Sequence, residues 1–206
     1  LQGLVDRFSL HGERLGDVAG GAVMKHSRDF NLVRESVLST TLSRETPAFD
    51  LQQACGTGLE ACMVVANKIA LGHIDCAIAC GVDTTSGAPI GVNEKMRRIL
   101  LDAASAKTTG KRLAALSRLR PGMLVSPSLP RNGEPRTGLS MGEHAELMAR
   151  EWSVAREDQD QLALASHRNF ARAYDEGFFT DLMTPFNGIS RDNNLRADLT
   201  IEKLRA

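Results

Sequence analysis

The chain has 206 residues, of which 42% are hydrophobic, so it can bury one large core or two small ones. Its 25 basic and 25 acidic side chains balance, which argues against a nucleic-acid partner. Four cysteines without a CxxC pair and five scattered histidines predict neither a disulfide scaffold nor a metal site, and we expect no membrane span or signal peptide.

The first part of the chain predicts alternating helices and strands. Residues 31–42 predict a helix that Asn31 would cap, and the turn at 43–47 leads into a predicted strand over 48–53. Residues 56–71 predict a helix about 24 Å long. Its polar side chains form one narrow stripe and its other sides are apolar, so we expect this helix to be buried on most faces.

The end of this helix and the apolar segment after it complete a predicted strand–helix–strand unit. Gly72 stands where a glycine usually ends a helix, and the apolar run 76–82 predicts a strand in a sheet covered on both faces. Strand, helix and strand together predict a βαβ unit with a parallel, right-handed crossover. Cys76 and Cys80 would lie roughly 13 Å apart on that strand, too far to form a disulfide.

A loop at 84–91 marks the boundary between two predicted domains, residues 1–85 and residues 86–206. The second domain should be mainly helical. It contains an irregular loop over 120–138, which holds four of the seven prolines. A helix then begins at Ser140, whose hydroxyl and Glu143 predict a capping box.

That helix carries Met141, Ala145, Met148 and Trp152 on one face. A further helix opens with acidic residues at 156–160 and ends near Gly177.

A basic stretch over residues 95–120 precedes the irregular loop. It holds eight Lys and Arg against one acid and predicts two helices, each with an apolar face. Three functions fit it: attraction of the phosphates of a ligand, docking of an acidic partner, or contact with an anionic membrane surface. It also fits an exposed cationic helix pair that packs on its own domain.

Cys55 is the candidate nucleophile. It precedes the predicted helix 56–71, where unpaired N–H groups favour a thiolate and could stabilise an oxyanion. Gly56 and Gly58 remove side chains beside the sulfur, so that a bulky substrate could approach the backbone. The alternative is that Cys55 is a small buried apolar residue, as many free cysteines are.

Two motifs resemble those of the thiolase family. Residues 52–89, "QQACGTGLEACMVVANKIALGHIDCAIACGVDTTSGAP", resemble the nucleophile region, with Gln52 where thiolases often have Asn. Residues 138–179, which include "MGEHAE" and "REDQDQLALASH", resemble the family's second hallmark. Within the family, residues 89–130 look most like the loop domain of the degradative 3-ketoacyl-CoA thiolases. The resemblance implies an α/β fold, a layered parallel-sheet half with a mainly helical loop-domain insertion.

The resemblance also implies an activity, that of an acetyl-CoA C-acyltransferase in fatty-acid β-oxidation. Cys55 would attack a 3-ketoacyl-CoA, release acetyl-CoA and carry an acyl-thioester, with Gly56 and Gly58 supporting the oxyanion and the turn. Met141 and the adjacent Ser140 would contact the substrate. Coenzyme A would act as a substrate, and no cofactor is expected.

The resemblance has consequences for partners and for completeness. It suggests a homodimer or homotetramer in a bacterial-like cytoplasm or a mitochondrial matrix, with a hydratase/dehydrogenase partner subunit and a membrane surface as possible contacts of residues 95–120. Thiolases are about twice as long. Their activating His and second catalytic Cys lie in a C-terminal half, and the family's first strand is missing here too, so we expect the 206-residue chain alone to be inactive.

Two other functions are kept as alternatives. A β-ketoacyl synthase-type condensing enzyme shares the fold and a Cys at the same helix start, but lacks the loop-domain motifs. A non-catalytic half-thiolase that binds coenzyme A or lipid is the other. A complete chain would distinguish a thiolase from a ketosynthase, since near the C-terminus thiolases carry a second catalytic Cys and ketosynthases carry His–His or His–Asn.

Overall fold

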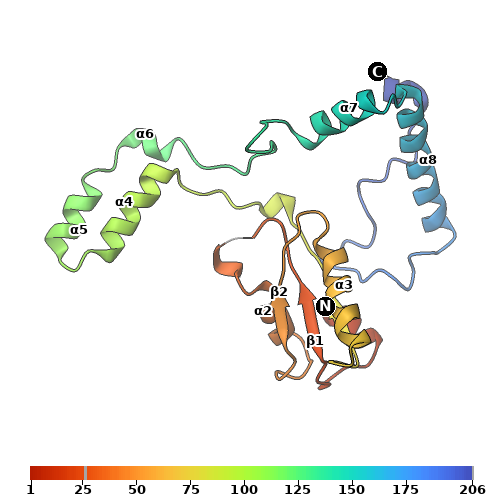
Figure 1. The fold of residues 1–206 in the computed structure, drawn as a ribbon, viewed down its shortest axis with the longest axis horizontal. Helices are drawn as coiled ribbons and strands as arrows, with labels where there is room; N and C mark the ends of the chain where they lie inside the picture. Colours follow the sequence, from red (N-terminus) through yellow and green to blue (C-terminus); the bar gives the residue numbers. More distant parts are fainter. Residues whose placement is uncertain (26, 206) are drawn as a thin grey trace. The chain divides into compact units, whose positions relative to one another are not determined.

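The computed structural model describes residues 1–25 and 27–205, which fall into two compact units, residues 1–130 and residues 131–206 (Figure 1). The first unit contains a sheet and six helices within the described residues, together with two short 3₁₀ turns. The domain boundary that the sequence predicts near residue 85 divides the family's core from its loop domain, and it stays a prediction. The elements of the first unit are α1 (Gln2–Arg7), β1 (Asp17–Gly20), α2 (Leu32–Leu38), β2 (Ala48–Asp50), α3 (Thr57–Ala70), β3 (Ala77–Ala79), α4 (Glu94–Ser105), α5 (Thr109–Leu116) and α6 (Pro121–Leu124).

The sheet is parallel and has the strand order β2-β1-β3. Val18 pairs with Ala48 on one side and with Ile78 on the other, so β1 lies between the two strands that α3 connects. The predicted βαβ connection is therefore parallel, as expected, but its two strands are not neighbours. Each predicted strand forms regular pairing over three residues only.

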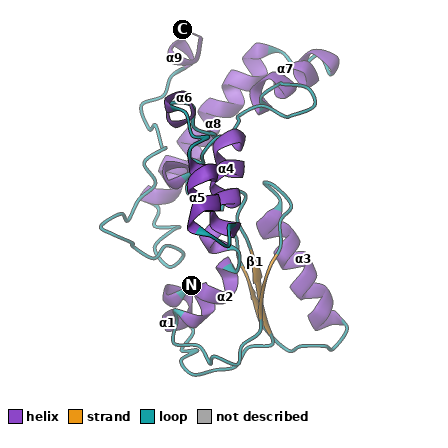
Figure 2. Cartoon of the chain, turned by 90° about the vertical axis from the view of Figure 1, so that its left-hand side faces the viewer, coloured by secondary structure: helices purple, strands orange, loops and turns teal. Residues whose placement is uncertain are grey.

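Helices cover both faces of this sheet (Figure 2). On one face, apolar residues of α1 and α2 pack on β1 and β3 in a cluster of buried side chains. On the other face, Ala61 and Val65 of α3 pack on Ala19 and on half-buried residues of β2 and β3. All four residues of β1 are buried. The predicted sheet, covered on both faces, is confirmed at this central strand.

Helix α3 ends as predicted but is less buried than predicted. Gly72 has φ of +68°, and the N–H groups of Gly72 and His73 donate to Ile69 and Lys68, which is a Schellman motif. Only one face of the helix is covered, because α3 packs on β1 and β3 from one side. Leu59 is 69% exposed, so the expected burial on most faces is wrong for this chain.

The polar stripe of α3 also has a structural role. Lys68 forms an ion pair with the buried carboxylate of Asp17, and its ammonium lies 4.7 Å from the centre of the Phe49 ring. Lys68 therefore anchors the last turn of the helix to β1 and β2. Three residues of α3 are buried, namely Thr57, Ala61 and Val65.

Helix α2 is shorter than predicted. It ends at Leu38 rather than at residue 42, and the Asn31 side chain makes no capping hydrogen bond within the described part of the chain. The Thr40 hydroxyl donates to the Val37 carbonyl at 2.7 Å, and Leu42 is buried in the core. The residues after Leu38 therefore form a tight bend back towards the core.

Helices α4 and α5 form the predicted basic hairpin. Asn93 and Thr108 cap them with side-chain oxygens, and Ile99, Ala103 and Ala115 are buried where the helices meet. The short helix α6 interrupts the predicted irregular loop. The signal for α6 was Pro121, because proline favours the first position of a helix.

The second unit consists of α7 (Met141–Glu151), α8 (Arg156–Asp175) and α9 (Ile201–Arg205). The capping box of Ser140 and Glu143 is confirmed, and α8 ends before Gly177, which has φ of +74°. Met141 and Trp152 are 74% and 70% exposed, so their shared face lies open in this unit. Within residues 1–25 and 27–205, the structure contains no helix with the length and apolar character needed to span a bilayer.

Candidate active site at the start of helix α3

Cys55 lies in a tight turn between β2 and α3. The turn is closed by the Gly56 N–H, which donates to the Gln53 carbonyl at 2.9 Å. Ala54, inside the turn, has φ of +45°, a conformation that a residue with a Cβ rarely adopts. Such backbone strain persists only where the surroundings enforce it, and it is concentrated at functional sites.

Thr57 provides this enforcement. Its hydroxyl donates to the Ala54 carbonyl at 2.7 Å and accepts from the Gln53 N–H at 3.0 Å, and the side chain is buried. Neither residue was predicted from the sequence. A hydroxyl residue in the first turn of a helix was a usable signal for Thr57. No signal in the sequence indicates the conformation of Ala54.

The turn lies against the carboxyl edge of the sheet because glycines allow a close approach. A Cβ at Gly21 would lie only 2.0 Å from the Leu51 carbonyl oxygen and 3.2 Å from Cγ2 of Thr57. At Gly81 it would lie 3.3 Å from Cα of Gly58. Open α/β sheets bind their ligands at this edge, so the turn is placed where a substrate site is expected.

The Cys55 side chain is exposed, and it precedes free N–H groups in the first turn of α3. Within the described residues, the N–H groups of Gly58 and Leu59 have no hydrogen-bond acceptor. A Cβ at Gly58 would meet no atom within 4 Å, so the space above this turn is open. At Gly56 it would lie 3.3 Å from the Gln53 carbonyl oxygen. The thiol is thus accessible at the positive end of a helix.

A neighbouring loop is fixed to the same edge of the sheet. Asp83, just after β3, accepts hydrogen bonds from the N–H groups of Val23 and Met24 at 3.1 and 2.8 Å. Asp50, at the end of β2, forms an ion pair with Lys25 at 3.2 Å. Neither acid was predicted from the sequence. Their position at the ends of strands was the available signal.

Cys80 is the other thiol near this edge, and its environment differs from that of Cys55. It lines a cavity of about 460 Å³ with Leu1, Leu4 and Ile78. Burial raises the pKa of the Cys80 thiol, and the thiol lies 3.6 Å from the Ala19 carbonyl oxygen. A thiol that is held protonated in apolar surroundings is a poor nucleophile. Cys55 therefore stays the better candidate.

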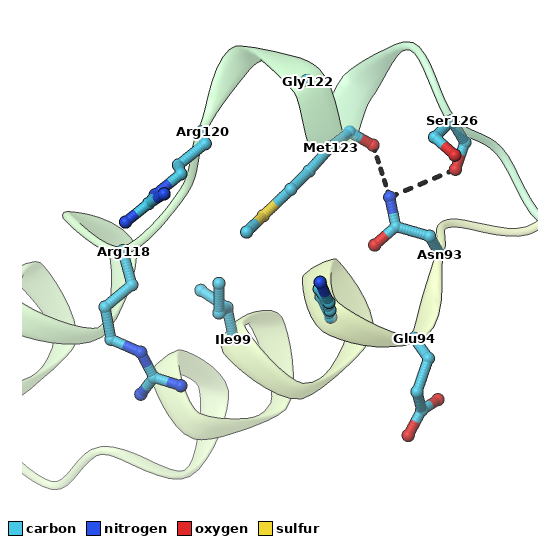
Figure 3. Close-up of a pocket in the computed structure, with 9 residues that line it drawn as sticks. Asn93, Glu94, Ile99, Arg118, Arg120, Gly122, Met123 and Ser126 are labelled. Carbon is cyan, nitrogen blue, oxygen red and sulfur yellow. Dashed lines mark hydrogen bonds between the residues drawn. The ribbon is translucent and has the colours of Figure 1, made fainter.

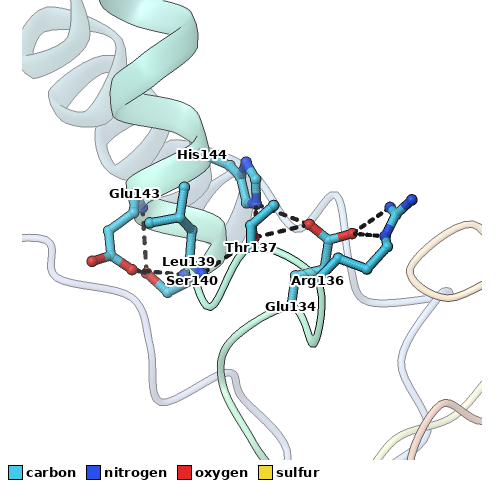
Figure 4. Close-up of polar contacts among 7 residues, drawn as sticks. All are labelled: Glu134, Arg136, Thr137, Leu139, Ser140, Glu143 and His144. Carbon is cyan, nitrogen blue, oxygen red and sulfur yellow. Dashed lines mark hydrogen bonds and ion pairs between the residues drawn. The ribbon is translucent and has the colours of Figure 1, made fainter.

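The predicted substrate contacts, Ser140 and Met141, belong to the second unit. The Met141 side chain is exposed, whereas the Ser140 hydroxyl donates to Glu143 at 2.8 Å and accepts from its N–H at 3.3 Å (Figure 4). Capping thus occupies the hydroxyl of Ser140, and Met141 is the freer of the two. Both substrate contacts stay predictions.

The loop before α7 is held by Glu134 (Figure 4). This carboxylate lies 3.3 Å from Nε2 of His144 and accepts from the Thr137 hydroxyl at 3.0 Å. A hydrogen bond from Arg136 and, to a smaller extent, one from Thr137 lower the pKa of Glu134. These contacts order the backbone that leads to Met141. Over the described residues, His, Cys, Asp and Glu side chains form no group of three suited to a metal ion.

Comparison with known proteins gives three consistent findings. The family model "Thiolase, N-terminal domain" matches residues 1–206. The 3-ketoacyl-CoA thiolases of Yersinia pestis (strain Pestoides F) and Yersinia pseudotuberculosis serotype O:1b (strain IP 31758) are each 39% identical over 204 residues, which is 96% of this chain and 47% of theirs. The chain thus spans about half the length of these curated relatives.

The third finding is structural. The crystal structure of the Bacillus anthracis acetyl-CoA acetyltransferase superposes with a TM-score of 0.76 at 24% identity, over 99% of this chain and 49% of that one. At this identity the likeness shows a shared fold. The fold expected from the sequence is therefore confirmed.

Proposed function

Because the chain belongs to the thiolase family, we propose that it is the N-terminal part of an acetyl-CoA C-acyltransferase that cleaves 3-ketoacyl-CoA. The observation that carries the proposal is the exposed Cys55 thiol, which precedes the free N–H groups at the start of α3. The names of the relatives, 3-ketoacyl-CoA thiolase, support the substrate class. The reaction would serve fatty-acid β-oxidation.

The proposed chemistry proceeds in two acyl transfers. The Cys55 thiolate attacks the 3-keto carbon, and the N–H groups of Gly58 and Leu59, which have no acceptor in the described residues, would stabilise the negative charge that develops on oxygen. The C2–C3 bond then breaks, and its electron pair leaves on the acetyl-CoA carbanion, which takes up a proton. The thiolate of a second CoA attacks the acyl-thioester and restores Cys55. The family resemblance assigns the acid and base to the C-terminal half of the thiolase fold.

Other parts of the chain would serve the substrate and the assembly. The exposed Met141 is proposed to contact the acyl or pantetheine portion of the substrate, with Ser140 acting chiefly as the cap of α7. The family resemblance supports a homodimer or homotetramer in a bacterial cytoplasm. The basic residues 95–120 would contact a partner subunit or an anionic surface. The described chain alone would be inactive, because its acid and base are supplied elsewhere in the fold.

Substitution of the nucleophile in the full-length protein tests the proposal. Cys55→Ser should abolish release of acetyl-CoA from a 3-ketoacyl-CoA, and mass spectrometry should show the acyl group on Cys55 of the unmodified enzyme. Cys62→Ser is the matched control, because Cys62 is an exposed cysteine on the same helix and should be dispensable. Undiminished turnover by the Cys55→Ser enzyme would remove the proposal.

Alkylation of the 206-residue chain gives a second test that needs no turnover. Iodoacetamide should modify Cys55 faster than the exposed Cys62 and Cys76, because only Cys55 precedes the unpaired N–H groups at the start of a helix. Cys80 should react most slowly, since burial raises the pKa of its thiol. Equal rates at the three exposed cysteines would show that α3 does not activate Cys55.

A further inference from the structure

The basic hairpin contains a pocket between the start of α4 and α6 (Figure 3). Its volume is about 790 Å³, within the range of small-molecule sites. All of its lining residues lie in the segment 93–126. They are Asn93, Glu94, Lys95, Ile99, Arg118, Arg120, Gly122, Met123 and Ser126.

The pocket has a surplus of positive charge. Arg118 is fixed by an ion pair with Asp102 at 2.8 Å, whereas Lys95 and Arg120 form no ion pair within the described residues. In Figure 3 the side chains of Arg118 and Arg120 lie along one side of the pocket, and the Glu94 carboxylate points away from them. Two cations are therefore left without an internal counter-charge.

The single carboxylate of the lining is already engaged by other cations. Glu94 accepts from Arg97 at 2.6 Å and from Arg98 at 2.8 Å, on the outer side of α4. The hydrogen bond from Arg97, with that from Arg98, lowers the pKa of Glu94 to about 2. Glu94 thus offers little attraction to Lys95 or Arg120. An incoming anion would not have to displace it.

The pocket also has an apolar side and a fixed frame. The Met123 side chain points towards Ile99, which is buried (Figure 3). The Asn93 amide nitrogen donates to the carbonyls of Met123 and Ser126 at 2.7 and 3.1 Å, while its oxygen caps α4 by accepting from Met96. One side chain therefore holds α6 onto α4. Guanidinium and ammonium groups beside a thioether form a surface suited to a phosphate linked to an apolar or planar group.

We propose that this pocket binds a phosphate group carried by such a ligand, with Arg120 and Lys95 as the principal contacts and Arg118 as support. Arg120 can donate two parallel hydrogen bonds to phosphate oxygens, and Lys95 adds a point charge. The inference sharpens the anionic contact proposed above for residues 95–120. It is independent of the chemistry at Cys55. The phosphate can come from a soluble phosphate ester or from a lipid headgroup, and the test separates these sources.

The test uses the 206-residue chain and two probes: adenosine 3′,5′-bisphosphate, and phosphatidylglycerol vesicles with phosphatidylcholine vesicles as the blank. The pocket variant is Arg120→Gln with Lys95→Gln. The matched control is Lys107→Gln with Lys111→Gln, which removes the same charge from hairpin residues outside the pocket lining. Circular dichroism checks that both variants keep their helices. Cys55→Ser should bind both probes like the unmodified chain. The binding test therefore does not depend on the acyl-transfer proposal, and either proposal can fail without the other.

We expect the pocket variant to bind at least one probe about tenfold more weakly, and the control variant to stay within about twofold of the unmodified chain. Loss confined to the bisphosphate assigns a soluble ester, and loss confined to the vesicles assigns a lipid headgroup. Equal loss in both variants would mean that diffuse charge attracts the anion and would overturn the proposal. Absence of binding to both probes would overturn it as well.

Discussion

Replacing Gly21 by alanine tests how the nucleophile turn is supported. The added Cβ would lie 2.0 Å from the Leu51 carbonyl oxygen, about 1 Å inside the closest ordinary contact. The clashing atom belongs to the backbone, and the Leu51 N–H is bonded to the Gly20 carbonyl at 2.8 Å, so rotation of a side chain cannot relieve the clash. The strand end and the turn must shift together.

The expected cost lies at the upper end of the overpacking range, about 3 kcal/mol in the free energy of unfolding of the first unit. For a domain of this size, that corresponds to a midpoint roughly 6–12 °C lower. Gly58→Ala adds the same methyl where no atom lies within 4 Å, inside a helix, and should be neutral or stabilising by up to about 1 kcal/mol. The two substitutions add the same methyl group but differ in the space available and in secondary structure, since only Gly58 lies in a helix.

Amide hydrogen exchange in a urea series is the appropriate assay, followed on peptides that cover residues 17–20 and 48–50. The single tryptophan, Trp152, lies in the second unit, so its fluorescence serves as an internal reference and not as the readout. Exchange at 17–20 should become faster in the Gly21→Ala chain. If Gly21→Ala were as stable as the unmodified chain, or if Gly58→Ala were equally damaging, close packing of the turn on the sheet edge would be refuted.

Three further outcomes follow from the described contacts. Thr57→Val keeps the shape but removes both hydrogen bonds of the hydroxyl, and should lower the free energy of unfolding by about 1–3 kcal/mol in urea titration; an unchanged midpoint would contradict the role given to Thr57. Lys68→Met removes the ion-pair partner of the buried Asp17 carboxylate. It should cost about 1–3 kcal/mol, less than a fully buried pair because Lys68 is 36% exposed, with recovery when Asp17→Asn is added; no recovery would exclude the ion pair as the cause. Hydrogen bonding from Arg97 lowers the pKa of Glu94 from 4.5 to about 2, so the stabilisation of α4 by the Glu94 carboxylate is complete above pH 4.5 and is lost as the pH falls towards 2. A circular-dichroism titration should show this loss of helix as a step, and Glu94→Gln should remove it. A step that persists in Glu94→Gln would belong to another group.

Local signals predicted the ends of several helices correctly, and the reason is physical. Gly72 takes a positive φ that favours glycine, and the Ser140 hydroxyl with the Glu143 carboxylate satisfies N–H groups one turn away. Both devices act over a few residues, so a short stretch of sequence contains all the information needed. The parallel character of the sheet followed in the same way from a strand, a helix and an apolar strand in succession.

Features that depend on residues far apart in the chain could not be predicted from short stretches of sequence. The pattern of α3 predicted burial on most faces, but apolar residues such as Leu59 show only that a surface can be buried, not what covers it. The insertion of β1 between β2 and β3 depends on pairing across the fold. The strained Ala54 and the hydroxyl of Thr57 hold each other in place, and neither residue type predicts that arrangement by itself.

The candidate site was predictable in its nucleophile and less so in its surroundings. Cys55 was identified from its place before an apolar helix, and the structure leaves its side chain exposed just before the unpaired N–H groups of α3. Asp83 and Asp50, which fasten the neighbouring loop, follow strands whose ends meet only in the folded sheet. Their role depended on strand order, which the sequence pattern did not contain.

The central place of β1 sets the order in which this fold can be completed. Val18 pairs with Ala48 and Ile78, which lie 30 and 60 residues further along the chain. During synthesis, β1 leaves the ribosome before both of its neighbours, and one of its edges stays open until residues 77–79 have emerged. Closing such long loops slows folding. A translation pause before that point would leave an apolar strand edge available to chaperones or to aggregation.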